Sequence, residues 1–324
     1  MNTEPLVTVI IPLYNKQRHL RRCVSSILAQ SYPNLEVIII DDHSTDGSTA
    51  RAEAIARQHP SIRLISNPGN LGLFETRYVG IRQAGGEYIT FVDADDWLET
   101  GAIRDMVELM LEHGVDLVQL RHRRRMRGMA VRYQECYEPE YAMRRIDGEE
   151  FRAFARYVGM TSYIHPAAWG KLYRTDLLRD MSHVKFEQFW GEDQIFNIQY
   201  LRMCRSMVFS DCIGYNYRWG GETTQYKYSA LREYKYVHQL KRHLGQDAEA
   251  IDGEIKLLLR YHVRSLMTEV GFTRQAVEML MTDELRDPLW QRVGLESTAA
   301  QLVEEESHAV QSSPLKYIAK RFLK

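Results

Sequence analysis

The sequence predicts an α/β fold in which a doubly wound, mostly parallel sheet carries helices on both faces and is followed by a helical C-terminal region. Three observations support this prediction. Strand-like and helix-like segments alternate through the first third of the chain. The strand-like segments are continuously apolar, as expected where both faces of a parallel sheet are covered. After residue 226, apolar positions recur at helical spacing.

The expected elements follow one another along the first 120 residues. Runs rich in β-branched residues predict strands at 6–11 and 35–40, because these residues pack well in a buried pleated sheet. A helix is expected between them, where apolar residues recur at Leu20, Cys23, Val24, Ile27 and Leu28. The alternation then predicts a strand at 62–65, a helix at 73–84, a strand at 88–92, a helix at 100–113 and a strand at 115–120.

Composition limits the class of protein. With 324 residues, 44% hydrophobic and 26% charged, the chain resembles an ordinary globular protein of one large or two medium domains. A formal net charge of −1 gives no overall basic field that would attract nucleic acid. The four cysteines are far apart and lack metal-binding spacing, so we interpret them as reduced thiols of a cytoplasmic protein.

Neither end of the chain predicts a membrane span. The first apolar run follows Glu4 and Pro5 rather than a basic start, and no stretch approaches the roughly 18 apolar residues that cross a bilayer. After Pro314, a short segment places apolar residues on one helical face among basic residues. That segment either packs against its own domain or lies peripherally on the inner face of the membrane.

Three acidic residues follow the strand expected at 88–92. Ligands of doubly wound sheets bind at the carboxyl ends of the strands, and divalent cations that bridge phosphates are held by one or two carboxylates. If the chain stayed extended, Asp93 and Asp95 would point to the same side and Asp96 away, which favours Asp93 and Asp95 as metal ligands. The alternative is a solvated acidic loop or a helix N-cap.

Three more polar loops, at 12–15, 41–47 and 67–72, follow the other early strands and therefore lie at the same sheet edge. Tyr14 could stack on a planar base, and Asp42 could accept an N–H from it. The alternative is that these loops are ordinary turns, since Asp-Gly and Asn-Pro-Gly are common turn formers. Arg77, in the helix that follows, either faces a diphosphate or points to solvent.

The residues of these loops resemble those of family 2 glycosyltransferases of the GT-A fold, the bacterial nucleotide-sugar-dependent type. The resemblance covers about the first 120 residues and is carried by Val7–Asn15, Ile40–Ser48, Asn70–Gly72 with Arg77, and Gly86–Asp96. It implies transfer of a sugar from a nucleotide donor, most often UDP-linked, with Mg²⁺ or Mn²⁺ and inversion at the anomeric carbon.

The resemblance also implies roles for individual residues. Asp42 would hold the uracil ring and Arg77 would approach the nucleotide. Asp93 and Asp95 would bind ribose and the metal-diphosphate. The base pocket and the adjoining nucleotide-sugar contacts would be formed by Pro12, Tyr14 and Asn15.

Transfer to a hydroxyl also requires a group that removes its proton. The resemblance assigns this role to Asp193, in a Glu-Asp pair that precedes an apolar helix, and the alternative is that the pair only caps this helix. Weaker candidates for a sugar or acceptor platform are Glu192, Trp190 and Trp169, although a tryptophan such as Trp190 is nearly as readily explained as a buried core residue.

Two further segments resemble the family more loosely. Lys171, in a Trp-x-Lys-Leu-Tyr-like segment, either contacts donor phosphate or packs structurally. Arg218 ends a Tyr-x-Tyr-Arg segment that the family often places over the diphosphate, and Gly220-Gly221 would let the following loop close. The basic run at 121–127 is either a solvated loop or a contact for a phosphorylated or lipid-linked acceptor.

Together these expectations describe a metal-dependent inverting transferase that moves a sugar from a UDP-sugar to a hydroxyl of a glycan or lipid-linked glycan in surface polysaccharide synthesis. Residues 1–120 would be its nucleotide-sugar-binding half, 121–225 its acceptor half with the base, and 226–324 a helical region. The alternatives are a non-catalytic nucleotide-sugar-binding protein or a nucleotidyltransferase. The intact Glu-Asp pair argues against the first, and the absence of a Gly-rich basic loop after the first strand argues against the second.

Overall fold

A computed structural model describes residues 4–126, 129–133, 139–156, 164–181, 192–218, 238, 241–242, 246, 248–268, 273–286 and 297–311. The chain divides into two compact units, Met1–Trp219 and Gly220–Lys324.

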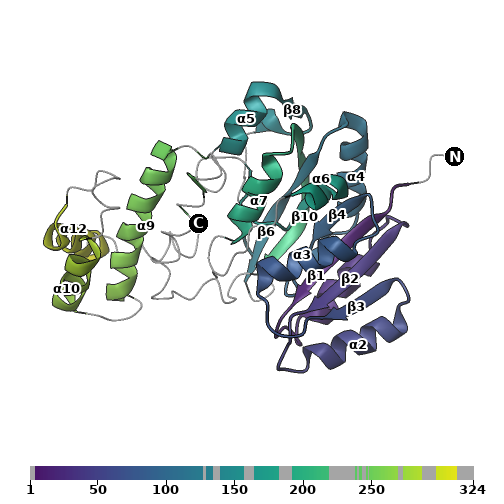
Figure 1. Cartoon of the computed structure of the whole chain (residues 1–324), viewed down its shortest axis with the longest axis horizontal. Coiled ribbons are helices and arrows are strands. Elements are labelled where there is room, and N and C mark those ends of the chain that lie inside the picture. Colours follow the sequence, from purple (N-terminus) through teal and green to yellow (C-terminus); the bar gives the residue numbers. More distant parts are fainter. Residues whose placement is uncertain are drawn as a thin grey trace. The chain divides into compact units, whose positions relative to one another are not determined.

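The first unit is built on a mixed sheet, which has ten strands among the described residues (Figure 1). The early strands are β1 (Val7–Leu13), β2 (Leu35–Asp41), β3 (Ile62–Ser66), β4 (Tyr88–Phe91) and β5 (Trp97–Leu98). The later strands are β6 (Leu117–Met126), β7 (Met129–Tyr133), β8 (Arg145–Asp147), β9 (Lys171–Arg174) and β10 (Ser206–Arg218).

The strands run in the order β3-β2-β1-β4-β9-β6-β10-β5, with β7 beside β6 and β8 beside β10. The first four are mutually parallel, which confirms the sequence prediction for this half of the sheet. In the other half, β9 is antiparallel to both of its neighbours, and β6 and β10 are parallel to each other. The sheet is therefore less uniformly parallel than the sequence suggested.

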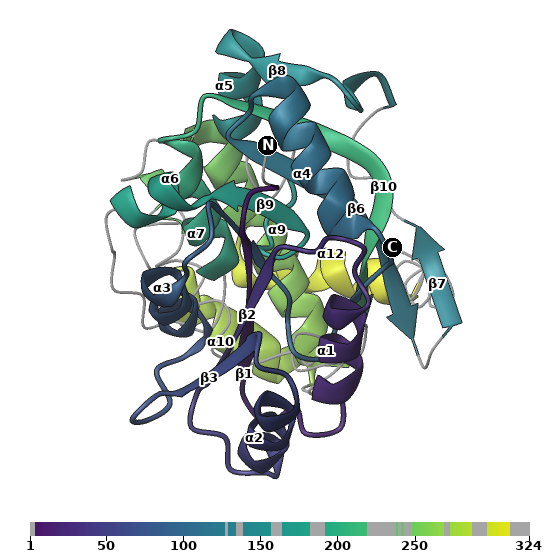
Figure 2. The same cartoon turned by 90° about the vertical axis from the view of Figure 1, so that its right-hand side faces the viewer.

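Helices cover both faces of this sheet. They are α1 (Leu20–Leu28), α2 (Ser48–Gln58), α3 (Leu73–Gln83), α4 (Ala102–His113), α5 (Gly148–Arg156), α6 (Thr175–Asp180) and α7 (Glu192–Leu201), with a 3₁₀ turn at Pro139–Tyr141. Figure 2 shows α3, α6 and α7 on one side of the strands and α1 and α4 on the other. The sequence did not predict α2, whose apolar side is formed mainly by small alanines.

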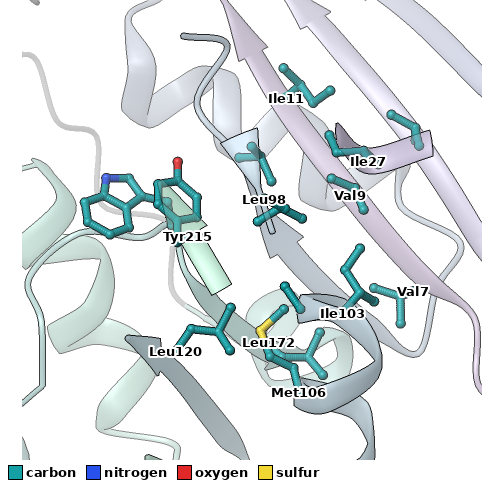
Figure 3. Packing of buried hydrophobic residues seen from close by; sticks show 14 of the residues in the cluster. Val7, Val9, Ile11, Ile27, Leu98, Ile103, Met106, Leu120, Leu172 and Tyr215 are labelled. Carbon is teal, nitrogen blue, oxygen red and sulfur yellow. The ribbon is translucent and has the colours of Figure 1, made fainter. Parts of the chain in front are cut away.

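Alternation along β1 divides its side chains between two cores. Val7, Val9 and Ile11 pack with residues of α1 and α4 in the larger cluster, as Figure 3 shows. Ile10 points to the opposite face, where α3 crosses β1 at Gly80. A Cβ at Gly80 would lie 2.6 Å from the Ile10 side chain, so glycine permits this close approach.

The basic run of the sequence lies largely in a strand. β6 continues through Arg121–Met126, where it pairs in parallel with the end of β10. Arg125 donates from Nε to Asn216 Oδ1 at 2.7 Å. The interpretation of this run as a solvated loop is therefore wrong, and the boundary expected at residue 120 falls inside β6.

The second unit is helical in its described part, as predicted. Its helices are α9 (Ala248–Thr268), α10 (Arg274–Glu284) and α12 (Ala299–Gln311). They share an apolar core that includes Leu259, Val277 and Leu302. No helix in the described ranges is long and apolar enough to cross a bilayer. The basic segment after Pro314 lies outside the described residues.

Candidate active site

The acidic residues after β4 form a turn. The backbone N–H of Asp96 donates to the carbonyl of Asp93 at 2.9 Å, so the chain does not stay extended as the sequence argument assumed. The turn nevertheless leaves the Asp93 and Asp95 side chains 23% and 16% exposed, whereas Asp96 is buried. As expected, Asp93 and Asp95 differ from Asp96 in their exposure to solvent. This difference arises from the geometry of the turn and not from strand alternation.

Asp96 anchors this turn to the end of β10. The Tyr215 hydroxyl donates to Asp96 Oδ2 at 2.7 Å and accepts from the Asp93 N–H at 3.2 Å. The N–H of Arg218 donates to the other oxygen of Asp96 at 2.7 Å. Burial, with the charges of Asp93 and Asp95, raises the pKa of Asp96 well above its usual range. Both carboxylate oxygens of Asp96 thus accept hydrogen bonds that hold the turn against β10.

Aromatic packing holds Tyr215 in place. Its ring stacks on Trp169 with centroids 4.4 Å apart and planes at 9°. Tyr217 also stacks on Trp169, at 5.4 Å. Figure 3 places the Tyr215 hydroxyl end away from the aliphatic side chains of the cluster. Trp169 is buried, so the structure gives it a role in supporting Tyr215.

Asp95 faces two cations. Its Oδ2 atom lies 3.2 Å from Lys16 Nζ and 3.3 Å from an Nη atom of Arg218. Lys16 lies in the loop between β1 and α1, and Arg218 is the last residue of β10. The family resemblance predicted a role for Arg218 but none for Lys16, which directly follows the predicted nucleotide loop at 12–15. The site therefore brings one carboxylate between two basic groups.

Arg77 joins the acidic turn to α7. One Nη donates to Asp193 Oδ1, and the other lies 3.4 Å from Asp93 Oδ1. The guanidinium is fully buried, so the alternative of a solvent-facing helix arginine is wrong. Burial opposes the charge of Arg77, but the carboxylates of Asp193 and Asp93 raise its pKa above the usual value.

The Glu-Asp pair begins α7 at the same place. Burial, together with the charge of Asp193, raises the pKa of Glu192 to about 8. Burial also raises the pKa of Asp93 to about 6, although the nearby Arg77 acts in the opposite direction. Burial and the neighbouring carboxylates thus disfavour ionisation of Glu192 and Asp93, whereas the charge of Arg77 favours it.

Asn15 connects the loops after β1 and β2 by hydrogen bonds. Asn15 adopts a left-handed conformation with φ 51°, and its Oδ1 accepts from the N–H groups of Thr45 and Asp46 at 2.8 and 3.2 Å. The neighbouring Tyr14 side chain is 38% exposed. Pro12 is buried within β1. These contacts place an exposed aromatic ring at the sheet edge that carries the acidic turn.

Asp42 accepts hydrogen bonds from the loop between β3 and α3. It is buried, and its oxygens accept from Asn67 Nδ2 at 2.8 Å, Leu71 N at 2.8 Å and Gly72 N at 2.9 Å. The carboxylate therefore orders the loop that begins α3. A contact with uracil, which the family resemblance implied, stays a prediction.

Lys171 makes structural contacts. Its buried ammonium donates to the carbonyls of His165 at 2.7 Å and Ala167 at 2.5 Å. These contacts support the structural alternative over a contact with donor phosphate. Trp190 and the segment that contains Gly220-Gly221 lie outside the described residues.

The sheet thus brings the acidic turn after β4 together with the Glu-Asp pair that begins α7. The family model for glycosyl transferase family 2 matches residues 8–182, which is more than half of the chain. The protein belongs to glycosyl transferase family 2.

Curated relatives agree with this assignment. The chain is 28% identical to the glycosyltransferase GlyA of Streptococcus pneumoniae over 220 residues, which cover 67% of the chain and 31% of GlyA. It is 36% identical to GlyG of the same organism over 113 residues, or 35% of the chain and 38% of GlyG. The chain thus spans about a third of the length of these relatives.

Solved structures show the same fold. TarS 1–349 of S. aureus in complex with UDP-GlcNAc has a TM-score of 0.65 at 20% identity, covering 95% of this chain and 92% of TarS 1–349. The mannosyltransferase PcManGT of Pyrobaculum calidifontis, in complex with GDP-Man and Mn²⁺, has a TM-score of 0.55 at 16% identity, covering 96% and 89%. At these identities the likeness establishes the GT-A fold alone.

Proposed function

We propose that this protein is a metal-dependent inverting glycosyltransferase that uses a UDP-sugar. The observation that carries the proposal is the convergence of Asp93 and Asp193 on Arg77, with the partly exposed Asp95 in the same acidic turn as Asp93. This arrangement combines carboxylates for a metal-diphosphate with a separate carboxylate for the acceptor. The TarS complexes with UDP and UDP-GlcNAc support a uridine nucleotide on this fold.

The residues present suit a hard divalent cation such as Mn²⁺ or Mg²⁺. Such ions bind oxygen ligands, often one or two carboxylates completed by substrate phosphates. Asp95 already attracts two positive side chains, and Asp93 and Asp95 would hold the ion. When bound, the metal would neutralise charge that develops on the departing diphosphate.

Asp193 would remove the proton from the acceptor hydroxyl. Arg77 binds its Oδ1, so we assign proton transfer to Oδ2. The buried guanidinium also contacts Asp93, so it holds Asp193 near the turn that follows β4, where the donor would lie. Direct attack of the acceptor oxygen on the anomeric carbon, with departure of UDP, is a single displacement and inverts that carbon. Arg77 therefore acts as a positioning residue.

The donor base would stack on the exposed ring of Tyr14, beside the loop that Asn15 orders. A hydroxyl of a glycan or lipid-linked glycan, in surface polysaccharide synthesis at the cytoplasmic face of the membrane, would be the acceptor. The resemblance to the family supports this part of the proposal.

The donor assignment is tested by release of UDP from a panel of nucleotide sugars, with and without EDTA. We expect turnover with a UDP-sugar and its loss in EDTA. In the same preparation, UDP with Mn²⁺ should raise the melting temperature and CMP should not. Preference for a non-uridine nucleotide in calorimetry would contradict the donor assignment, and full activity after EDTA dialysis would contradict the metal assignment.

The hydroxyl of Tyr215 should matter for binding at the acidic turn. Tyr215→Phe removes two hydrogen bonds that join Asp96 to Asp93, each worth about 1 kcal/mol. We expect the affinity for UDP with Mn²⁺ to fall by about three- to tenfold, measured by calorimetry, because the carboxylates lose their fixed orientation.

Tyr200→Phe is the matched control. The buried Tyr200 hydroxyl also donates to an oxygen, the carbonyl of Asp116 at 2.6 Å, and accepts from a backbone N–H, that of Arg174 at 3.0 Å. Its removal should cost similar stability in urea denaturation and leave nucleotide affinity unchanged. Equal losses of affinity in the two variants would reduce Tyr215 to a general packing role.

A further inference from the structure

Two positive side chains from separate elements meet at a single carboxylate oxygen. Lys16 and Arg218 both approach Asp95 Oδ2, at 3.2 and 3.3 Å. Their side chains are 23% and 29% exposed, and that of Asp95 is 16% exposed. The contact is thus partly shielded from solvent, where charge interactions are stronger than on an open surface.

The backbones that carry the two cations are fixed independently of Asp95. The N–H of Lys16 donates to Ser48 Oγ at 2.9 Å, and the N–H of Arg218 donates to Asp96 at 2.7 Å. The flexible side chains can therefore change partner while their points of attachment stay in place. A four-carbon stem gives Lys16 the greater freedom, since the planar guanidinium of Arg218 is more restricted.

The two cations compete with a divalent metal ion for Asp95 Oδ2. An arriving ion meets their positive charge at the oxygen it needs, although Asp93 in the same turn adds negative charge nearby. The two cations attract a diphosphate, because its oxygens are good hydrogen-bond and charge partners for ammonium and guanidinium groups. Binding of a diphosphate would draw the cations from Asp95 and expose that oxygen to the metal.

We propose that Lys16 is a ligand of the donor diphosphate and that, before the donor binds, it occupies the metal-binding oxygen of Asp95. The donor therefore binds first through Lys16, and the metal follows. The inference rests on the proposed function, because it takes the donor to be a nucleoside diphosphate sugar and Asp95 to be a metal ligand.

Lys16→Met separates the two roles of this side chain in the full-length protein. Binding of Mn²⁺ alone is followed by electron paramagnetic resonance of the free ion, and binding of UDP alone is followed by calorimetry in EDTA. The variant should bind Mn²⁺ about three- to tenfold more tightly than the natural protein, because a competing charge is gone. It should bind metal-free UDP more weakly by a similar factor.

Two controls complete the experiment. Lys16→Arg keeps the charge and should stay close to the natural protein in both measurements. Arg21→Met removes one positive charge from an exposed position of α1 and should change neither affinity by more than about twofold, since exposed charges are screened. Circular dichroism and melting temperature verify that each variant is folded.

The outcomes distinguish the inference from the proposed function. Unchanged or weaker Mn²⁺ binding in Lys16→Met overturns the inference alone, provided that the natural protein binds UDP with Mn²⁺. Failure of the natural protein to bind UDP in EDTA, while it binds UDP with Mn²⁺, also overturns the proposed order and leaves the function standing. Failure to bind UDP under either condition overturns both.

Discussion

Asp95→Asn is expected to reduce turnover by about 10³-fold or more, since a neutral amide cannot hold the cation that offsets the diphosphate charge. The change keeps the size of the side chain. It removes the negative charge that Lys16 and Arg218 now share, so stability should fall slightly, by no more than about 1 kcal/mol. Steady-state release of UDP, with metal titrated from micromolar to millimolar, measures the effect.

Asp147→Asn provides a control for the loss of a carboxylate in an ion pair. Asp147 lies on β8, where its Oδ2 accepts from Arg145 Nε at 2.7 Å. This variant should retain the activity and the metal dependence of the natural protein. If Asp95→Asn also retained full turnover, Asp95 would be excluded as a necessary metal ligand.

Asp193→Asn is expected to remove transfer by roughly 10²–10⁴-fold while leaving UDP-sugar affinity nearly unchanged. The carboxylate acts on the acceptor and not on the nucleotide, so kcat should fall with little change in donor binding. The variant should also be less stable, because the buried Arg77 loses one of its two negative partners. The loss should be limited to the order of 1–3 kcal/mol, since Asp93 remains as a partner. Activity is therefore measured well below the melting temperature of the variant.

Asp176→Asn is a matched control for Asp193. Asp176 also lies in the first turn of a helix and pairs with an arginine, Arg174. If the role of Asp193 were only to stabilise the start of α7, both variants would show mild effects, since asparagine caps helices as well as aspartate. A small change in rate for Asp193→Asn would return this residue to a structural role and make Glu192 the next candidate.

Much of the fold could be predicted because it is specified by local patterns. Continuous apolar runs located β1 to β4, and the spacing from Leu20 to Leu28 located α1. The pattern failed where an element had a weak apolar signal, as in α2, or where charged residues extended a strand. The basic residues Arg121–Arg125 belong to β6 because pairing with β10 satisfies their backbone groups, which no local pattern shows.

The site could be predicted in part for a similar reason. Asp93 and Asp95 follow a recognisable strand, and carboxyl ends of neighbouring parallel strands meet at one edge. Their orientation could not be derived in this way, since it depends on the turn and on the Tyr215 hydroxyl. Lys171 matched a family segment, but its burial on the carbonyls of His165 and Ala167 became apparent only in the fold.

The sequence by itself determined the family, the parallel half of the sheet and the loops that carry the acidic residues. The tertiary structure alone decided which charges face one another. Arg77 and Asp193 are 116 positions apart, and Tyr215 and the Asp93 backbone are 122 apart. Contacts of this range arise when the whole sheet assembles, because burial then requires each polar group to find a partner from a distant segment.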